Sequence, residues 1–331
     1  MMRMKAIQIT EYGDVGCLRL AEDAKIPQPT DEEVLIKVDY AGVNFIDVYY
    51  RKGIYAGNLF PLTLGQEGMG TITQVGNHVT SFKVGDRVVF LMGGSGSYAE
   101  FATAHKDKLL KIPDDIEATT ATALGIQGLT AHYLTHDTYR LQAGNVALIH
   151  AAAGGTGQLL TQMAKASQAT VIATVSNEDK RNLALAAGAD HVIIYKDYQF
   201  LAELKTLLSG DLVDVVYDAI GQATFEQSIN SLKPRGMLVM YGQASGKVPP
   251  FEILTLSQKG SLFLTRPTLL HYMLTESERS NRARDLFTMI RNQNLNVKID
   301  KVFPLTEAAA AQSYLEARKT MGKILLKIAT S

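Results

Sequence analysis

Residues 146–157 read VALIHAAAGGTG, an apolar run that leads through a glycine-rich turn into a helical pattern over residues 158–167. Short apolar runs bounded by glycine are typical of buried strands. A strand that enters a helix through glycines lets backbone N–H groups approach a pyrophosphate at the positive end of the helix. The usual G-x-G-x-x-G spacing falls on positions 152, 154 and 157, but position 152 is alanine, so a purely structural turn stays the alternative.

The same rhythm continues on the C-terminal side of this turn. Apolar runs recur at intervals of roughly 20–25 residues, with helical patterns between most of them. The runs are residues 146–149, 171–175, 191–194, 213–217, 237–241 and 261–264. Continuous apolar strands that alternate with helices indicate parallel pairing with both sheet faces covered. Six such strands predict an α/β fold, a doubly wound Rossmann sheet that binds a dinucleotide.

The first 125 residues have a different pattern. Their short runs, rich in Val, Ile, Thr and aromatic residues, are separated by Gly or Pro. These runs are residues 6–9, 34–40, 70–75, 87–90 and 98–102. Such spacing predicts a mostly antiparallel sheet or a small barrel.

The C-terminal tail changes pattern again after Pro267. It contains a long amphipathic helix over residues 276–292 and two further strands, and we assign it to the β-rich part of the chain. The predicted domains are therefore residues 1–125 with 267–331, and residues 126–266.

Composition excludes several classes of protein. The 331 residues carry 33 basic and 33 acidic side chains, which argues against general nucleic-acid backbone binding, since that affinity needs clustered Lys and Arg. Cys17 is the only cysteine, so neither an intramolecular disulfide nor a multi-cysteine metal site can form. No stretch has the pattern of a signal peptide or the ~20 apolar residues of a membrane span. We expect a cytoplasmic protein.

The end of the second Rossmann strand indicates which dinucleotide binds. NAD sites usually place Asp or Glu there, whereas this chain has Ser176, followed by Lys180 and Arg181. A serine does not repel a 2′-phosphate, and a nearby cation can pair with one. The alternative is that Ser176 caps the following helix with Asp179 at the third position. The pattern favours NADP(H) over NAD(H).

No metal site is expected. Gln66, in the segment GQEG, stands where a histidine ligand would be sought, and no second cysteine exists. His132 and His136 have an i, i+4 spacing but no third ligand, so packing histidines are the favoured interpretation. A nicotinamide without a metal suits electron-poor acceptors such as quinones or activated double bonds.

Five segments carry a family resemblance. They are residues 44–55 (NFIDVYYRKGIY), 127–131 (QGLTA), 152–157 (AAGGTG), 188–190 (GAD) and 266–267 (RP). With them the chain resembles the NADPH:quinone oxidoreductases, the zeta-crystallin-like branch of the zinc-free medium-chain dehydrogenase/reductase superfamily. The resemblance covers essentially the whole chain. It implies a GroES-like catalytic domain and a Rossmann domain that binds NADPH.

The resemblance also implies site residues. Those for NADPH are Asn44, Thr130, Gly154, Gly155, Thr156, Gly157, Ser176, Lys180, Tyr195, Tyr241, Gly242, Ser245, Phe263 and Thr265. Those for the acceptor are Asn44, Asp47, Tyr49 and Tyr55, of which the two tyrosines can stack on a flat ring. Ordinary packing of the tyrosines is the alternative. No catalytic residue is singled out, and relatives suggest a homodimer joined through Ser261–Leu264.

Three functions are carried forward. The first is NADPH-dependent, metal-free reduction of a quinone. The second is reduction of α,β-unsaturated aldehydes or ketones on the same scaffold. The third, a nucleotide-bearing RNA-binding protein, ranks last because the sequence has no basic stripe with interleaved aromatic residues. The sequence does not distinguish hydride from single-electron transfer.

Overall fold

The computed structural model describes residues 2–57 and 59–328, which form two compact units. The first unit comprises Met1–Ile126, Thr275–Ala283 and Val297–Ser331, and the second comprises Gln127–Leu274 and Arg284–Asn296. The sequence assigned all of residues 267–331 to the first domain. The structure places residues 267–274 and 284–296 with the second unit, where the Tyr272 ring stacks on Tyr133 at 4.2 Å.

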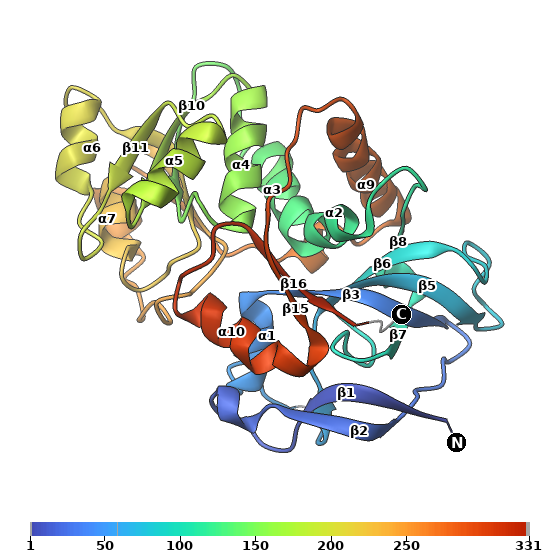
Figure 1. Cartoon of the computed structure of the whole chain (residues 1–331). Coiled ribbons are helices and arrows are strands. Elements are labelled where there is room, and N and C mark those ends of the chain that lie inside the picture. Colours follow the sequence, from blue (N-terminus) through green and yellow to red (C-terminus); the bar gives the residue numbers. More distant parts are fainter. Residues whose placement is uncertain (1, 58, 329–331) are drawn as a thin grey trace. The chain divides into compact units, whose positions relative to one another are not determined.

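The second unit is built on a six-stranded sheet with the order β11-β10-β9-β12-β13-β14 (Figure 1). Its strands are β9 (Val146–His150), β10 (Thr170–Val175), β11 (His191–Ile194), β12 (Val213–Asp218), β13 (Leu232–Met240) and β14 (Phe263–Thr265). All five pairings are parallel. The chain runs outward from β9 to β11 and then returns to β12 on the other side of β9, which is the strand order of a doubly wound Rossmann sheet. The predicted α/β fold of this part is confirmed.

Helices connect these strands. They are α3 (Leu129–Tyr133), α4 (Gly155–Ala166), α5 (Glu178–Ala186), α6 (Leu201–Leu207), α7 (Phe225–Asn230) and α8 (Leu254–Gln258), with the π-helix η4 (Leu134–Thr138) and the 3-10 turn η5 (Leu269–Tyr272). Because the crossovers on the two sides of β9 run in opposite directions, right-handed connections place their helices on opposite faces of the sheet. Leu148, Ile172, Val216 and Leu238, from four neighbouring strands, are fully buried between sheet and helices. This packing needs an apolar residue at nearly every strand position, as the sequence shows.

The first unit is mostly β. Its larger sheet has the order β15-β16-β3-β5-β6-β8, with β7 also paired to β3, and a smaller sheet has the order β2-β1-β4. The strands are β1 (Arg3–Ile9), β2 (Arg19–Lys25), β3 (Glu33–Val43), β4 (Leu62–Thr63), β5 (Glu67–Val75), β6 (Arg87–Leu91), β7 (Phe101–His105), β8 (Leu109–Lys111), β15 (Ile299–Pro304) and β16 (Lys323–Lys327). All pairs except β15–β16 are antiparallel, and β16 pairs with β3, so C-terminal residues extend the sheet that N-terminal residues begin.

Short helices cover this sheet. They are α1 (Phe45–Arg51), α2 (Ala118–Ala123), α10 (Ala308–Glu316), and the 3-10 turns η1 (Val15–Cys17), η2 (Lys106–Lys108) and η6 (Leu305–Glu307). Figure 1 shows α10 beside α1. The π-helix η3 (Leu124–Gly128) and the long helix α9 (Glu276–Arg291) each begin in the first unit and end in the second. In the part of the chain that the structure describes, no helix combines the length and apolarity needed to cross a membrane.

Candidate active site

The glycine-rich turn lies between β9 and α4. Ala151 has a left-handed φ of +51°, and its carbonyl oxygen accepts a hydrogen bond from the Gly154 N–H at 2.9 Å. A Cβ atom at Gly157 would collide with that carbonyl group, and one at Gly155 would collide with the Gln127 side chain. The N–H groups in the first turn of α4 have no acceptor within the helix, so they are available to a pyrophosphate.

Ala152 stands where the usual motif has its first glycine. It is fully buried, and its N–H faces the Thr174 carbonyl oxygen at 3.3 Å. The left-handed residue of this turn is Ala151, so no glycine is required at position 152. Gly154 and Thr156 are only half-buried. The turn therefore joins β9 to α4 through closely packed backbone, as the sequence predicts, despite its departure from the motif.

The residues predicted to hold a 2′-phosphate lie at the carboxyl edge of β10 and β11. Ser176 directly follows β10 and is exposed, and Lys180 lies in the first turn of α5. The Tyr195 N–H donates to the Val175 carbonyl oxygen at 3.1 Å, which fixes the end of β11 beside the end of β10. Parallel strands end at the same edge, so a hydroxyl, an ammonium and a phenol share one corner of the sheet.

The alternative role of Ser176 as a helix cap is wrong. Asn177 caps α5, because its side-chain oxygen accepts from the backbone N–H three residues later at 2.9 Å. Ser176 therefore stands outside the helix, and Asp179 lies at the second helical position rather than the third. Arg181 lies 3.5 Å from Glu178 on the same helix.

The loops that follow β12 and β13 are hydrogen-bonded to each other. The Asp218 carbonyl oxygen accepts from the N–H groups of Tyr241 at 2.9 Å and Gly242 at 3.3 Å. The Ser245 hydroxyl donates to the Ile220 carbonyl oxygen at 2.8 Å. Burial, and then the nearby Asp218 charge, raise the pKa of the Tyr241 hydroxyl well above its ordinary value. The predicted nicotinamide contacts Tyr241, Gly242 and Ser245 thus lie at the carboxyl edge of the sheet, in a loop that is hydrogen-bonded to the loop after β12. We name these two loops, residues 219–224 and 241–246, the double loop.

The remaining predicted cofactor residues of the second unit are more dispersed. Thr130 lies in α3 and is almost fully buried. Thr265 pairs with Val239, close to the double loop, whereas Phe263 pairs with Met237 further from the carboxyl edge. The Phe263 side chain is 56% exposed. The structure thus brings Thr265 nearer to the predicted nicotinamide loops than Phe263.

In the first unit, Asn44 belongs to a buried charged cluster. The Lys323 ammonium group donates to the Asn44 side-chain oxygen at 2.8 Å and to the Glu67 carboxylate, and the Asn44 amide nitrogen donates to that carboxylate at 2.9 Å. Since an ammonium group only donates and a carboxylate only accepts, the orientation of the amide is settled. The second Glu67 oxygen accepts from the Ile126 N–H. We name this set, Asn44, Glu67 and Lys323, the ion-pair cluster.

Asp47 lies next to this cluster and is wholly buried. Its carboxylate accepts from the N–H groups of Asn44 at 2.8 Å and Gln66 at 2.9 Å, and from the Tyr98 hydroxyl at 3.0 Å. Burial raises the pKa of Asp47 to about 7, although these hydrogen bonds and the Lys323 charge oppose the rise. With three donors from the protein itself, this side chain is placed to hold Asn44 rather than to meet a ligand.

The predicted acceptor tyrosines contact each other. The rings of Tyr49 and Tyr55 meet edge to face with centroids 5.7 Å apart, and Tyr50 meets Tyr55 at 5.6 Å. Tyr49 is buried, whereas Tyr55 is 38% exposed. Stacking on a planar acceptor therefore remains available to Tyr55, while Tyr49 supports it from beneath.

The donor groups do not fit a metal ion. Among residues 2–57 and 59–328, no three His, Cys, Asp or Glu side chains are grouped so as to hold one. The ion-pair cluster already contains a cation, the Lys323 ammonium group, between its amide and its carboxylate. His132 and His136 stack on each other at 4.2 Å.

Several buried polar residues carry no signal in the sequence that points to their partners. Glu67 directly follows Gln66, where a metal ligand would be expected, and its partner Lys323 is 256 positions away. A charged residue at the end of an apolar strand is the only local signal, and it does not name the partner. His150 and Asp218 were likewise missed, although each is the last residue of a buried strand.

Comparison with known proteins identifies the family. Residues 30–114 match the model of the alcohol dehydrogenase GroES-like domain, and residues 155–291 match that of the zinc-binding dehydrogenases. The chain is 41% identical to a quinone oxidoreductase of Pseudomonas aeruginosa, over 97% of this chain and 99% of that one. The chain belongs to the quinone oxidoreductase family. The predicted resemblance to this branch of the medium-chain dehydrogenases/reductases is confirmed, as is the GroES-like part of the fold class.

Two further relatives of the chain differ in the acceptor for which they are named. The structure of an Escherichia coli quinone oxidoreductase complexed with NADPH superposes with a TM-score of 0.94 at 36% identity, covering 98% of this chain and 100% of that one. A 2-haloacrylate reductase from a Burkholderia species is 39% identical over 92% of this chain and 93% of its own length. The family thus includes reductases named for different acceptors.

Proposed function

We propose that this chain is an NADPH-dependent quinone reductase that acts without a metal ion. The observation that carries the proposal is the glycine-rich turn at the carboxyl end of β9, in a chain 41% identical to a quinone oxidoreductase over almost its whole length. When bound, NADPH supplies reducing equivalents from C4 of its nicotinamide ring. The first turn of α4, which packs against Ala151 and Gln127 at Gly157 and Gly155, offers backbone N–H groups that suit the pyrophosphate of such a cofactor.

The proposed cofactor contacts lie in the second unit, except for Asn44 of the first unit. We assign the pyrophosphate to the turn at Gly154, Gly155, Thr156 and Gly157, and the 2′-phosphate to Ser176, Lys180 and Tyr195. We assign the nicotinamide and its ribose to Asn44, Thr130, Tyr241, Gly242, Ser245, Phe263 and Thr265. In this proposal the second unit is the NADP-binding domain and the first unit is the catalytic domain, with the boundaries of the two compact units in place of the predicted 126–266 and 1–125 with 267–331.

The acceptor side is assigned to the first unit. Tyr49 and Tyr55 would flank a flat ring, and Asn44 would contact the acceptor or the nicotinamide. Asp47 contributes by holding the Asn44 backbone, because its carboxylate already has three donors from the chain.

Cofactor choice is tested by Lys180→Ala. Loss of one charged hydrogen bond to the 2′-phosphate costs ~1.5–3 kcal/mol, so KM for NADPH should rise roughly 10- to 100-fold while KM for NADH barely changes. Arg181→Ala is the matched control, since Arg181 lies beside Glu178. Equal effects of Lys180→Ala on both cofactors would remove Lys180 from the phosphate site.

Acceptor class is tested by steady-state kinetics with NADPH against a benzoquinone series, an alkenal series and 2-haloacrylate. We expect the highest kcat/KM with quinones. The alternative, reduction of activated double bonds, is supported by the similarity to a 2-haloacrylate reductase. A strong preference for alkenals or 2-haloacrylate would favour that alternative.

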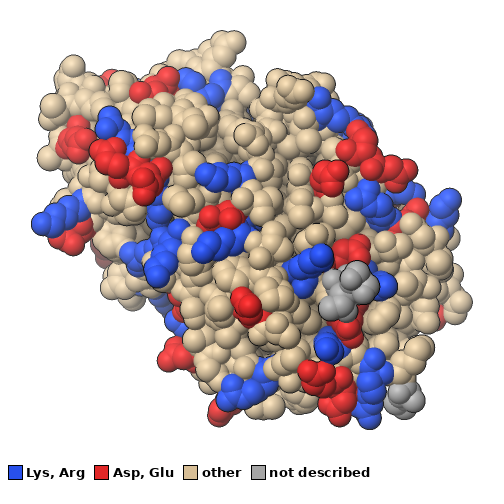
Figure 2. Space-filling model, in the orientation of Figure 1, with Lys and Arg blue, Asp and Glu red and all other residues tan. Residues whose placement is uncertain are grey.

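RNA binding remains the third candidate. Figure 2 shows Lys and Arg interspersed with Asp and Glu over the face that it draws, in keeping with the equal numbers of basic and acidic residues. Tight RNA binding in a filter assay at physiological ionic strength would bring this candidate back.

We also propose a homodimer joined through the edge strand near Ser261–Leu264. Strand β14 ends the six-stranded sheet and pairs with β13, and Leu264 on β14 is 37% exposed. An unpaired edge with apolar side chains favours association with a second copy. Light scattering of wild type and Leu264→Glu tests this, since a wild-type monomer would contradict it. A single cysteine suits the cytoplasmic location that we propose for the protein.

A further inference from the structure

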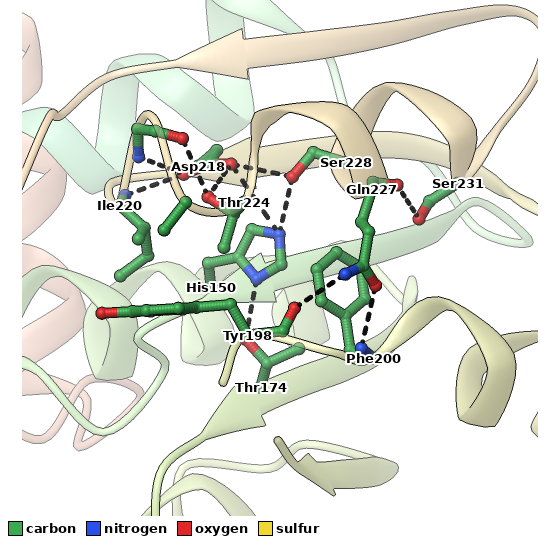
Figure 3. Close-up of polar contacts among 12 residues, drawn as sticks. His150, Thr174, Tyr198, Phe200, Asp218, Ile220, Thr224, Gln227, Ser228 and Ser231 are labelled. Atoms are coloured by element: carbon green, nitrogen blue, oxygen red, sulfur yellow. Dashed lines mark hydrogen bonds and ion pairs between the residues drawn. The ribbon is translucent and has the colours of Figure 1, made fainter. Parts of the chain in front are cut away.

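A buried polar network surrounds His150, the residue that directly precedes the glycine-rich turn of the second unit (Figure 3). His150, the last residue of β9, is fully buried; its Nδ1 is 2.7 Å from the Thr174 hydroxyl, and its Nε2 is 3.0 Å from the Ser228 hydroxyl. Ser228 and Thr224 donate to one oxygen of Asp218 at 2.8 and 2.7 Å. We name this set, His150, Thr174, Asp218, Thr224 and Ser228, the histidine network.

Counting hydrogens settles the state of His150. The single hydroxyl proton of Ser228 goes to Asp218, so His150 Nε2 must donate to the Ser228 oxygen. Burial lowers the pKa of His150, although the Asp218 charge opposes this, and the ring is neutral. Its Nδ1 therefore accepts from the Thr174 hydroxyl. Every polar atom of the ring is satisfied in one tautomer only.

Asp218 connects the network to the double loop. Its other carboxylate oxygen accepts from the N–H groups of Ile220 at 2.7 Å and Gly221 at 3.1 Å, which shapes the loop after β12. Its carbonyl oxygen accepts from Tyr241 and Gly242, which start the loop after β13. Asp218 thus contacts both loops that border the proposed nicotinamide position, the first through its carboxylate and the second through its backbone carbonyl oxygen.

His150 connects the same network to the pyrophosphate turn. The left-handed Ala151 follows it directly, and the Ala151 carbonyl oxygen both accepts from Gly154 and limits the space at Gly157. The Nδ1 atom of His150 accepts from the hydroxyl of Thr174, which lies two residues before Ser176. The histidine network therefore spans the carboxyl ends of β9, β10 and β12, on both sides of the point where the strand order reverses.

We propose that His150, Ser228 and Asp218 are positioning residues that hold the three cofactor-binding segments as one preorganised surface. None of them needs to touch the cofactor. The inference rests on the proposed function, because it assigns a role toward the same dinucleotide. It predicts a distinctive signature: weakening the network should lower affinity for NADPH and NADH alike, since the pyrophosphate turn and double loop serve both.

The experiment measures dissociation constants for NADPH and NADH by nucleotide fluorescence, together with the thermal midpoint of the nucleotide-free protein. Ser228→Ala removes the bridge between His150 and Asp218. Loss of one such buried hydrogen bond should raise both constants by the same factor, about tenfold. Ser231→Ala is the matched control: Ser231 is equally buried, but its hydroxyl donates to the Gln227 carbonyl oxygen, outside the network (Figure 3).

Thr174→Val removes the hydroxyl that donates to His150 Nδ1 with little change in side-chain shape. It therefore tests the positioning role of the network if Ser228→Ala does not fold. His150→Gln keeps a donor and an acceptor and should retain more affinity than His150→Leu. Unchanged affinities in folded Ser228→Ala and Thr174→Val, with only a lower thermal midpoint, would overturn the inference. A wild-type chain that binds neither nucleotide would overturn the proposed function itself, and the inference with it.

Discussion

Each unit buries a polar network, and the two networks are stabilised by different kinds of interaction. The ion-pair cluster of the first unit sets a full positive charge, Lys323, against a full negative charge, Glu67, with side-chain exposures of 1% and 0%. The histidine network of the second unit has one charge, Asp218, which is surrounded by hydroxyl and N–H donors and a neutral ring. In the histidine network these hydrogen bonds compensate the buried carboxylate, with Ser228 and Thr224 donating to one of its oxygens and the N–H groups of Ile220 and Gly221 to the other.

The difference determines what each network tolerates. Removing one partner of a buried ion pair leaves an uncompensated charge in a medium of low dielectric constant, whereas replacing both is often neutral. Removing one hydroxyl from the histidine network costs less, about 1–3 kcal/mol, because Asp218 keeps its other hydrogen-bond donors. Substitutions in the ion-pair cluster should therefore mainly lower the free energy of unfolding. Substitutions in the histidine network should mainly change the shape of the loops that it holds.

The largest effect is expected from Lys323→Met. Glu67 would remain buried without its cation, and the free energy of unfolding should fall by about 3–5 kcal/mol, measured by urea denaturation. The double variant Lys323→Met with Glu67→Gln is the control. There the Asn44 amide can rotate to accept from Gln at position 67, so most of the stability should return. A single variant no less stable than the double variant would contradict the ion-pair account.

The second prediction concerns pH. The contributions of Asp47 and His150 to the free energy of unfolding should change in opposite directions as pH rises. Asp47, beside the ion-pair cluster, has its pKa raised from 3.8 to about 7 by burial. The folded state therefore keeps a proton that the unfolded state loses, and this contribution to stability declines as pH rises from about 4 to about 7. Burial lowers the pKa of His150 from 6.5, so its contribution declines instead as pH falls below 6.5.

Urea unfolding across this pH range separates the two contributions. The difference in stability between wild type and Asp47→Asn should shrink with rising pH, and that between wild type and His150→Gln should shrink with falling pH. The slopes are compared rather than the absolute values, because the amide in Asp47→Asn cannot accept from all three donors. If both stability differences changed with pH in the same direction, the opposite pH responses of Asp47 and His150 would be refuted.

The fold was predictable because apolar periodicity records it directly. Strand β11 coincides with its predicted range, 191–194, and β9 differs by one residue. Strand β13 begins at Leu232 rather than 237, because Pro234 and the left-handed Arg235 interrupt the apolar pattern while the chain still pairs with β12 through an irregular register. Local sequence marks apolar strands well and irregular ones poorly.

The polar networks were not predictable in the same way. Glycine spacing and the residues after β10 indicated a dinucleotide turn and a phosphate corner, since those signals are contiguous in sequence. Lys323 meets Asn44 across 279 positions, and His150 meets Ser228 across 78. Such contacts depend on which strands become neighbours, so pairing of buried polar residues follows from topology and not from spacing.

The smallest effect is expected at the edge of the first unit, where a charge pair reaches solvent. Glu316, 23% exposed, accepts from the buried Arg51 at 2.7 Å and from Lys52. Burial alone would raise the pKa of Glu316, but the hydrogen bonds from Lys52 and Arg51 outweigh it and hold the pKa below its ordinary value.

Glu316→Gln should therefore lower stability by about 0.5–1 kcal/mol at pH 7, because Arg51 keeps Gln312 and Gly13 as acceptors. The difference should shrink as pH falls below 4.5, the ordinary pKa of the carboxyl group, and vanish below the lowered pKa of the folded state, where the group is protonated in both states. Glu22→Gln is the control, since Glu22 and Lys5 are exposed and 3.5 Å apart, and no measurable change is expected. A loss at Glu316 as large as that of Lys323→Met would show that burial of one partner alone, rather than of both, sets the response of a charged network.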